Sequence, residues 1–439
     1  MRIFKAPYIY SRGEFLENYV IIEDQGIIQN IIPISQFKKK FPNEKAIIVY
    51  EDLILLPGTV NTHNHSFQSL VRGFSDDLKF NQWRDQGIYK FSKLLDQNGI
   101  YIGAVLAFYE MARYGITTVC DFFYIHDGGN DNARAVIQAA KDVGIRLVVA
   151  RCMYDWEGAP EQYQETVSQA KKNCLSLIKE VGTDPMVKVY PAPHSLHGAS
   201  RAMIEAGIEI AKDNKSFLHM HIAEARYEVE QVRKKYATTP IKFLDQMGAV
   251  SEHLVGVHCV WIDDDEIDLM AEKGMKLSYN PASNMFLGDG VTPILKLLNK
   301  GVLIGLGTDG ACSNNRTSIF DEMRTASLLQ KVAHLDGSVC DATTSFKMGT
   351  YNAAKVLGIP AGALNVGFYC DFVGIKLSDI SLLPFKKENL IKNIVYALSP
   401  KAIDTVVVGG NEILKEGEHT SLSAEEVYSK VQQLTEGWK

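Results

Sequence analysis

The sequence has 439 residues, of which 46% are hydrophobic and 22% are charged, and its formal net charge at pH 7 is −6. This length exceeds the about 250 residues of a single barrel domain and leaves room for a smaller second domain. The acidic chain has no basic stripe for a nucleic-acid backbone, and no apolar stretch approaches the roughly 20 residues of a membrane span, so we expect neither partner.

The cysteines and the N-terminal segment indicate the compartment. The seven cysteines form no CxxC pair and are odd in number, which favours reduced thiols over a disulfide framework. The first residues lack the hydrophobic region of a signal peptide. We therefore expect a cytoplasmic protein.

Both ends of the chain show the residue pattern of β-strands. Short runs rich in β-branched residues alternate with turns there, and neither end has enough strands to close a core alone. The pattern predicts one composite β-sandwich domain built from residues 1–56 and 363–439. The expected strands include residues 19–23, 27–33, 46–50, 367–375 and 405–413.

Between the two ends, residues 57–362 show apolar runs that alternate with amphipathic segments. Strand–helix alternation of this kind predicts an α/β fold, namely a (β/α)8 TIM barrel. The first predicted strand starts slightly earlier, at residue 53. The eight expected strands are 53–63, 117–123, 146–151, 186–193, 217–221, 254–258, 276–280 and 302–309.

His63 and His65 lie at the end of the first predicted barrel strand. Residues two apart on a strand point the same way, so both imidazoles can reach one metal ion. The active sites of such barrels lie at the C-terminal ends of the strands. The ends of other strands carry further candidates: His194, His221 with Glu224 three residues later, His258 and Asp309.

These residues in combination resemble the amidohydrolase superfamily. The segments Asn280–Asn284 and Gly307–Asn315 are similar to a subgroup of that superfamily. The subgroup holds the S-adenosylhomocysteine/methylthioadenosine deaminases, the guanine and 8-oxoguanine deaminases and the triazine hydrolases. The resemblance covers nearly the whole chain. It implies a hydrolase that acts on C–N bonds in cyclic amidines, and it implies a homodimer.

The resemblance also implies a ligand set and catalytic roles. It implies one divalent metal ion, with zinc as first choice and ferrous iron as second. The implied ligands are His63, His65, His221 and Asp309. Glu224 is implied as the proton shuttle, and His258 as the side chain that orients the nucleophile or stabilises the adduct. Asp309 is implied to accept a hydrogen bond from the nucleophile as well. Two-metal relatives use a carboxylated lysine where this strand ends at His194, so one metal is expected.

Further polar side chains are candidates for substrate contacts. For Arg151, at the end of the third predicted strand, the alternative is a structural salt bridge; for His194 it is a structural role at a strand end. His219 shares a face with His221 but lies deeper, so we expect it to pack in the interior. The candidate substrate contacts are Gln68, Arg84, Arg151, His194 and His197.

Three functions compete on the sequence alone. The first is a deaminase of an aminated purine, pterin or pyrimidine, whose base edge Gln68 could pair with. Nucleoside deaminases of the subgroup carry a ribose-binding Glu after the first strand. Residues 89–93 contain no Glu, which disfavours an adenosine-type nucleoside.

The second function is a formimino-group hydrolase similar to formiminoglutamate deiminase, because residues 65–68 and 80–84 resemble that family's pocket segments. Its carboxylate-binding Arg falls where this chain has His197, a poorer bidentate partner. A triazine-type chlorohydrolase uses the same scaffold. The third is a catalytically dead barrel that serves in binding, which the complete set of ligands and shuttle disfavours.

Overall fold

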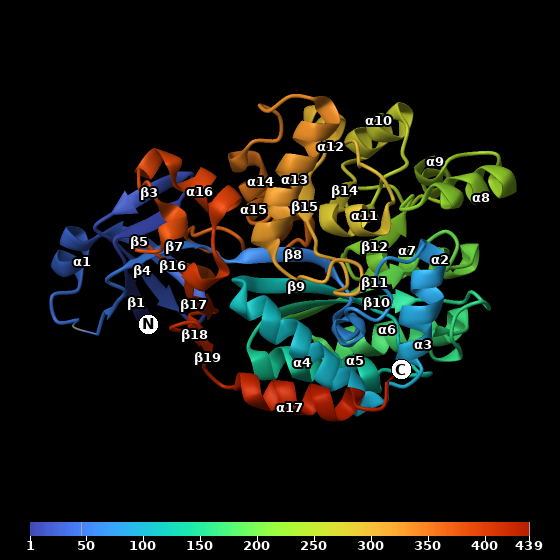
Figure 1. The fold of residues 1–439 in the computed structure, drawn as a ribbon, viewed down its shortest axis with the longest axis horizontal. Coiled ribbons are helices and arrows are strands. Elements are labelled where there is room, and N and C mark those ends of the chain that lie inside the picture. The colour runs from blue at the N-terminus through green and yellow to red at the C-terminus, as the bar shows by residue number, and fades with distance from the viewer. Residues whose placement is uncertain (45, 439) are drawn as a thin grey trace.

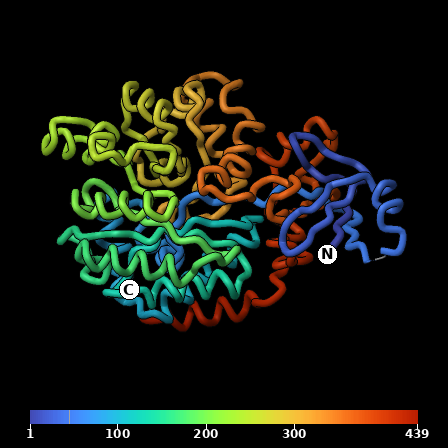
Figure 2. The backbone as a smooth tube through the Cα atoms, turned by 180° about the vertical axis from the view of Figure 1, so that it is seen from behind, coloured from blue at the N-terminus to red at the C-terminus, as the bar shows by residue number. Residues whose placement is uncertain are grey.

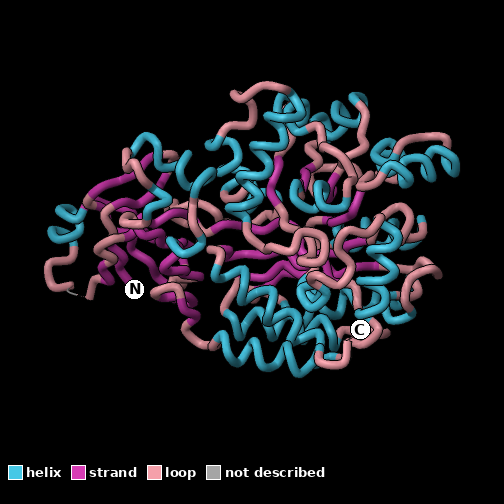
Figure 3. The backbone as a smooth tube through the Cα atoms, viewed as in Figure 1, coloured by secondary structure: helices cyan, strands magenta, loops and turns pink. Residues whose placement is uncertain are grey.

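A barrel of parallel strands forms the larger part of the computed structural model, which describes residues 1–44 and 46–438. Figure 3 shows its strands surrounded by helices. Two four-stranded parallel sheets, β8–β11 and β12–β15, make up the barrel. The strands are β8 (Thr59–Asn64), β9 (Ile116–Phe123), β10 (Arg146–Met153), β11 (Val187–Pro193), β12 (Leu218–Ile222), β13 (Leu254–His258), β14 (Lys276–Tyr279) and β15 (Ile304–Leu306).

The two sheets meet along both of their edges. β11 packs beside β12 and β15 beside β8. At one seam the His221 amide donates to the His194 carbonyl at 3.0 Å, and at the other the Asp309 amide donates to the His63 carbonyl at 3.0 Å. Both bonds lie at the C-terminal ends of the strands, so they fix the edge of the barrel that carries the candidate ligands.

Helices cover the outside of the barrel. Local sequence sets their ends: α10 begins at a capping box formed by Asp263 and Glu266 and ends at Gly274, whose φ of 71° suits glycine. No helix among the described residues is long and apolar enough to cross a membrane. The helices of this part are α2 (Phe80–Trp83), α3 (Tyr89–Ser92), α4 (Gln97–Arg113), α5 (Asp131–Val143), α6 (Val167–Val181), α7 (Arg201–Asp213), α8 (Arg226–Tyr236), α9 (Pro240–Gln246), α10 (Asp264–Lys273), α11 (Pro281–Leu287), α12 (Ile294–Asn299), α13 (Ile319–His334), α14 (Ala342–Met348) and α15 (Tyr351–Val356).

Strands from both ends of the chain build the smaller part, seen in Figure 1 as blue and red ribbons side by side. A seven-stranded sheet has the order β19-β18-β17-β16-β7-β2-β3, and a four-stranded sheet has the order β5-β4-β1-β6. Phe4, Ile9, Leu55 and Phe372 are among the residues of one buried apolar cluster that draws on both sheets. The strands are β1 (Arg2–Lys5), β2 (Tyr8–Ser11), β3 (Glu14–Glu17), β4 (Tyr19–Asp24), β5 (Ile27–Pro33), β6 (Ile48–Val49), β7 (Leu53–Pro57), β16 (Phe372–Lys376), β17 (Ile403–Val408), β18 (Asn411–Lys415) and β19 (Glu418–His419).

The structure differs from the sequence prediction in two places. The expected strand 53–63 is two strands, because β7 pairs with β16 of the small sheet while β8 enters the barrel. Gly58 separates the two strands. The chain passes Thr117 so closely there that a Cβ atom on residue 58 would lie 2.2 Å from Oγ1 of Thr117.

The terminal segment is not β-structure throughout. It includes α16 (Leu390–Ala397), which packs on α13 and α14, and α17 (Ala424–Thr435), which packs on α4 of the barrel. Figures 1 and 2 show α17 alongside the barrel from opposite sides. The small part also carries α1 (Ile34–Lys40).

Candidate active site

The implied ligand residues come together at the C-terminal ends of the barrel strands. One ring nitrogen from each of His63, His65 and His221 lies within 4.8 Å of the other two, and all three side chains are buried. Oδ1 of Asp309 lies 3.4 Å from Nε2 of His63 and 3.3 Å from Nε2 of His65. Two ligands that each lie about 2.0–2.1 Å from a tetrahedral zinc ion are about 3.3 Å apart, so this spacing fits one ion.

Hydrogen bonds determine which ring nitrogen of His65 and of His221 faces the candidate metal site. Nδ1 of His65 donates to the Phe122 carbonyl at 2.6 Å, and Nδ1 of His221 donates to the His194 carbonyl at 3.0 Å. These bonds leave Nε2 of each ring free as a metal ligand. Both ring nitrogens of His63 are buried without a hydrogen-bond partner among the described residues. An unpaired buried imidazole is costly unless it binds something, which fits a ligand.

Burial also puts these imidazoles in their metal-binding form. Desolvation lowers the pKa of His63 to about 3, and it lowers the pKa of His65 and of His221 below the usual range. The rings are therefore neutral near pH 7, as metal ligation requires.

Asp309 is held in one orientation. Its Oδ2 accepts hydrogen bonds from Oγ of Ser283 at 2.6 Å and Oγ of Ser313 at 3.0 Å, and its Oδ1 accepts from the Gly310 amide at 2.8 Å. Its φ is +58°, and His258 is also left-handed with φ of +68°. Such a conformation costs a non-glycine residue about 1–3 kcal/mol and is retained where the surrounding structure enforces it. The strain at these two strand ends fits a functional role.

Glu224 and His258 form a second group of side chains at the candidate metal site. Oε1 of Glu224 lies 3.5 Å from Nε2 of His258, whose Nδ1 donates to Oδ1 of Asn284 at 2.9 Å. Burial raises the pKa of Glu224 well above its usual range, and the carboxylates of Asp289, Glu228 and Asp309 add to the shift. A carboxyl group with a raised pKa can both take and release a proton near neutral pH, as a shuttle must.

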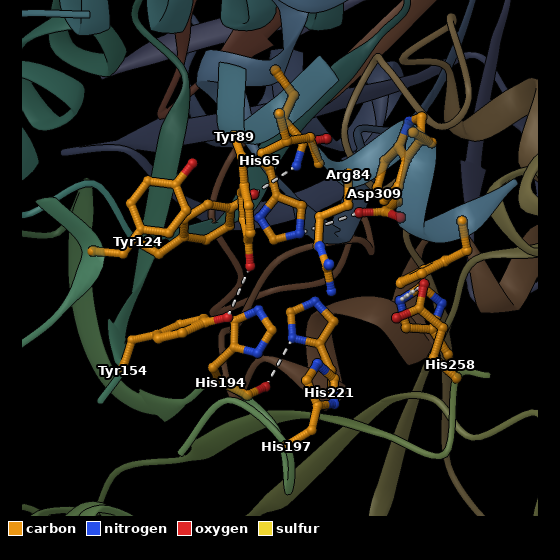
Figure 4. A pocket seen from close by; sticks show the side chains of 16 residues that line it. His65, Arg84, Tyr89, Tyr124, Tyr154, His194, His197, His221, His258 and Asp309 are labelled. Atoms are coloured by element: carbon orange, nitrogen blue, oxygen red, sulfur yellow. Dashed lines mark hydrogen bonds and ion pairs between the residues drawn. The ribbon is translucent and has the colours of Figure 1, made fainter. Parts of the chain in front are cut away.

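Four of the five expected substrate contacts line one pocket with these groups. Gln68, Arg84, His194 and His197 surround the same cavity as Glu224, His258 and Asp309; Figure 4 labels most of them. Gln68 is fixed on both sides of its amide, since its Nε2 donates to the hydroxyl of Tyr124 at 2.8 Å and its Oε1 accepts from Sγ of Cys312 at 3.0 Å.

Arg151 is not part of the pocket, which corrects the sequence prediction. Its side chain is fully buried and forms a two-pronged ion pair with Glu165, at 2.8 Å and 2.9 Å. Its Nε donates to Oδ1 of Asn130 at 2.8 Å. A buried charge requires such a partner, so this guanidinium ties loops together and is not available to a substrate. His219 is in the interior, as expected, and stacks on Tyr190.

Aromatic side chains that the sequence reasoning did not single out form much of the pocket wall. Tyr124 and Tyr154 directly follow β9 and β10, so their position at strand ends is a signal in the sequence that His, Asp, Glu and Arg alone did not cover. The others lie in short helical segments away from the strand ends and carry no such signal. The aromatic lining consists of Phe80, Trp83, Tyr89, Tyr124, Tyr154 and Tyr163.

Comparison with known proteins identifies the family. Residues 54–413 match the family model described as Amidohydrolase family. The chain belongs to the amidohydrolase family. This confirms the resemblance that the sequence motifs indicated, and with it the expected barrel with a small second domain.

Two curated relatives match this family member over almost their full length. The chain is 33% identical to a 5-methylthioadenosine/S-adenosylhomocysteine deaminase of Halothermothrix orenii, over 97% of this chain and 95% of the relative. It is 34% identical to a 5'-deoxyadenosine deaminase of Methanothermobacter thermautotrophicus, over 95% and 93%.

Solved structures agree with the fold. A zinc-bound adenosine deaminase from Xanthomonas campestris superposes with a TM-score of 0.91 at 26% identity, covering 99% of this chain and 97% of the other. An atrazine chlorohydrolase from Arthrobacter aurescens TC1 complexed with zinc has a TM-score of 0.91 at 23% identity, covering 99% and 100%, and supports the fold alone.

Proposed function

We propose that this amidohydrolase is a zinc-dependent deaminase that releases ammonia from an aminated purine-type heterocycle. The observation that carries the proposal is the ligand set His63, His65, His221 and Asp309 beside the Glu224–His258 pair; all of these residues except His63 line one pocket. The aromatic walls suit a flat ring. The names of the two curated relatives favour an adenosine derivative. This differs from the expectation from the sequence, in which the lack of a Glu in residues 89–93 disfavoured an adenosine-type nucleoside. The cytoplasmic location and the homodimer stay predictions.

The chain's own residues supply the proton transfers. A zinc ion held by the four ligands supplies Lewis acidity, which makes water nucleophilic near neutral pH. Glu224 takes the proton from the attacking water and passes it to the ring nitrogen beside the amino-bearing carbon. A C–O bond forms at that carbon, its C–N bond breaks, and the amino group leaves as ammonia with the second water proton.

His258 orients the nucleophile in this scheme. Its Nδ1 donates to Asn284, and burial lowers the pKa of the ring, so that it is neutral near pH 7. Nε2 then carries no hydrogen and accepts one. This favours orientation of the water over stabilisation of the adduct's charge, the other role that the sequence left open.

The test is ammonia release by zinc-loaded protein from adenosine, 5'-deoxyadenosine, methylthioadenosine, guanine, 8-oxoguanine, isoxanthopterin and cytosine. Release from a purine supports the proposal. Glu224→Gln should keep zinc and lose about 10²–10⁴-fold in kcat, whereas His65→Ala should lose both zinc and turnover. An active Glu224→Gln enzyme would contradict the shuttle assignment.

The formimino-group hydrolase differs from the deaminase only in the substrate, and the chlorohydrolase differs in the substrate and the leaving group. Because Arg84 lines the pocket, the formimino alternative is tested as well, with formiminoglutamate as a further substrate. Ammonia release from formiminoglutamate alone would move the function to that alternative. Chloride release from a chlorotriazine, without ammonia from any purine, would indicate the chlorohydrolase.

A further inference from the structure

Residues 80–92 build one wall of the pocket. The side chains from this segment that line the cavity are Phe80, Trp83, Arg84, Ile88 and Tyr89. The segment consists of α2, the π-helical turn Arg84–Ile88 and α3, and each of the two α-helices has four residues. Helices of that length are not stable alone, and π-helical turns are rare and frequent at functional sites. The position of this wall therefore depends on what packs against it.

Hydrogen bonds to the barrel loops support both ends of the wall. Near its start, Nε1 of Trp83 donates to the carbonyl of Cys312 at 2.8 Å. At its end, the hydroxyl of Tyr163 donates to Oγ of Ser92 at 2.5 Å, and Nε2 of Gln162 donates to the Ser92 carbonyl at 2.6 Å. Tyr163 also lines the cavity, so these bonds join two parts of the pocket lining.

A second support is an aromatic cluster formed by Phe74, Phe91 and Trp438. The ring of Phe91, a residue that is 2% exposed, stacks on the ring of Trp438 with centroids 5.1 Å apart and an interplanar angle of 23°. The ring of Phe74 lies 4.5 Å from that of Phe91 and 6.0 Å from that of Trp438. Aromatic pairs at such distances add stabilisation beyond the area that they bury. Because Phe91 and Tyr89 belong to the same short helix, the cluster supports the helix that presents Tyr89 to the pocket.

Trp438 reaches the wall from a part of the chain that is distant in sequence. α17 packs on α4 of the barrel, and a Cβ atom on residue 99 of α4 would lie 3.6 Å from Cδ1 of Leu434. The amide of Trp438 then donates to the Thr435 carbonyl at 3.0 Å. In Figure 1 the end of the chain marked C lies beside α3. The C-terminal helix thereby places an indole ring on the pocket wall, although Trp438 does not line the cavity.

We infer that Trp438 is a positioning residue for the proposed deaminase: by stacking on Phe91 it holds residues 80–92 in the conformation that binds the substrate. The candidate metal ligands lie at or near the ends of β8, β12 and β15, outside this segment. The loss of Trp438 should therefore weaken substrate binding and leave zinc binding intact. The inference rests on the proposed function for the reaction, but the state of the wall can be measured without turnover.

The first test is amide hydrogen exchange of the zinc-loaded protein, read by mass spectrometry. Trp438→Ala should speed exchange in peptides from residues 80–92 about 5- to 30-fold, because Phe91 loses a stacking partner and the wall opens more often. Peptides from β8, β12 and β13 should exchange as before. Trp438→Phe keeps a ring on Phe91 and should stay within about threefold of the unmodified protein.

The second test is steady-state ammonia release from the purine that the unmodified zinc-loaded protein turns over best. Trp438→Ala should raise KM about 3- to 30-fold, since the substrate binds only those molecules in which the wall is ordered. The kcat should change less than about threefold, because saturating substrate restores the ordered wall and the metal ligands are unchanged. Trp438→Phe should return KM to within about threefold of its original value.

Tyr428→Ala is the matched control, because Tyr428 is an aromatic residue of the same helix and is 65% exposed. It should leave both exchange and KM unchanged. Zinc content and melting temperature establish that each variant is folded. A purely structural role of Trp438 would lower the melting temperature without changing KM or the exchange of residues 80–92, and this result would overturn the inference. Faster exchange with an unchanged KM would overturn it as well.

Exchange separates this inference from the proposed function. If no purine releases ammonia, the deaminase is overturned, and the exchange of residues 80–92 in Trp438→Ala decides by itself whether Trp438 holds the wall. If a purine releases ammonia and neither exchange nor KM responds to Trp438→Ala, the deaminase stands and the positioning role is overturned.

Discussion

Asp121 is expected to hold the loop that presents His65. Its side chain is buried on β9. Oδ1 accepts from Nδ2 of Asn64 at 3.1 Å and from the Ser66 amide at 2.6 Å, and Oδ2 accepts from Oγ of Ser66 at 2.8 Å. Asn64 and Ser66 flank His65 in the chain, so these three bonds fix the backbone on either side of a metal ligand.

Asp121→Ala should lower both stability and zinc affinity. It leaves three buried donors unpaired at about 1–3 kcal/mol each. Because water can fill part of the space, we expect a loss of about 3–5 kcal/mol in the free energy of unfolding of the metal-free protein. Loss of a group that orients a ligand typically weakens metal binding about 10- to 100-fold.

Asp121→Asn is the matched control. Its amide oxygen still accepts from Asn64 and the Ser66 amide, and the Ser66 hydroxyl can rotate to accept from the new N–H, so stability should fall by about 1 kcal/mol or less. Zinc affinity is measured by competition with a chromogenic chelator, and stability by denaturant unfolding. If Asp121→Ala binds zinc as tightly as the unmodified protein, the assigned role is refuted.

Three further predictions concern charge and metal. Asp289→Asn removes a carboxylate that raises the pKa of Glu224; Glu224 should then lose its proton at lower pH, moving the acid limb of kcat/KM of the zinc enzyme downward, and an unmoved limb would count against this coupling. Chelation should lower the melting temperature, because an ion that binds only the folded chain contributes about 2.7 kcal/mol at 100 times its Kd; His65→Ala should show no zinc-dependent shift, and a shift equal to that of the unmodified protein would contradict its role. Arg151→Met should cost about 3–5 kcal/mol of unfolding free energy, since Glu165 is left buried and unpaired. Adding Glu165→Leu should restore part of that loss, and a single variant as stable as the double variant would refute the explanation.

The order of secondary structure and the chemistry at the strand ends could be read from the chain. Strand–helix alternation is a local pattern, and parallel strands place all their C-terminal ends at one edge. For that reason His63, His65, His221 and Asp309 could be expected together although up to 246 residues separate them in the sequence. The distances of 3.3–3.4 Å from Asp309 to His63 and His65 came only from the folded barrel.

Features beyond the strand ends depended on the tertiary structure. The alternation of side chains along a strand stops where the strand stops, so the direction of a loop residue is set by its neighbours in space. Arg151 lies near the end of β10 but faces Glu165 rather than the cavity, whereas Arg84 reaches the cavity from the short helical segment Arg84–Ile88, to which strand alternation does not apply. Likewise, the apolar run from Leu53 looks continuous, but Gly58 divides it between two sheets because the chain must pass Thr117 there. Composition and periodicity determined which residues could carry the chemistry; contacts between distant segments decided which of them face the substrate.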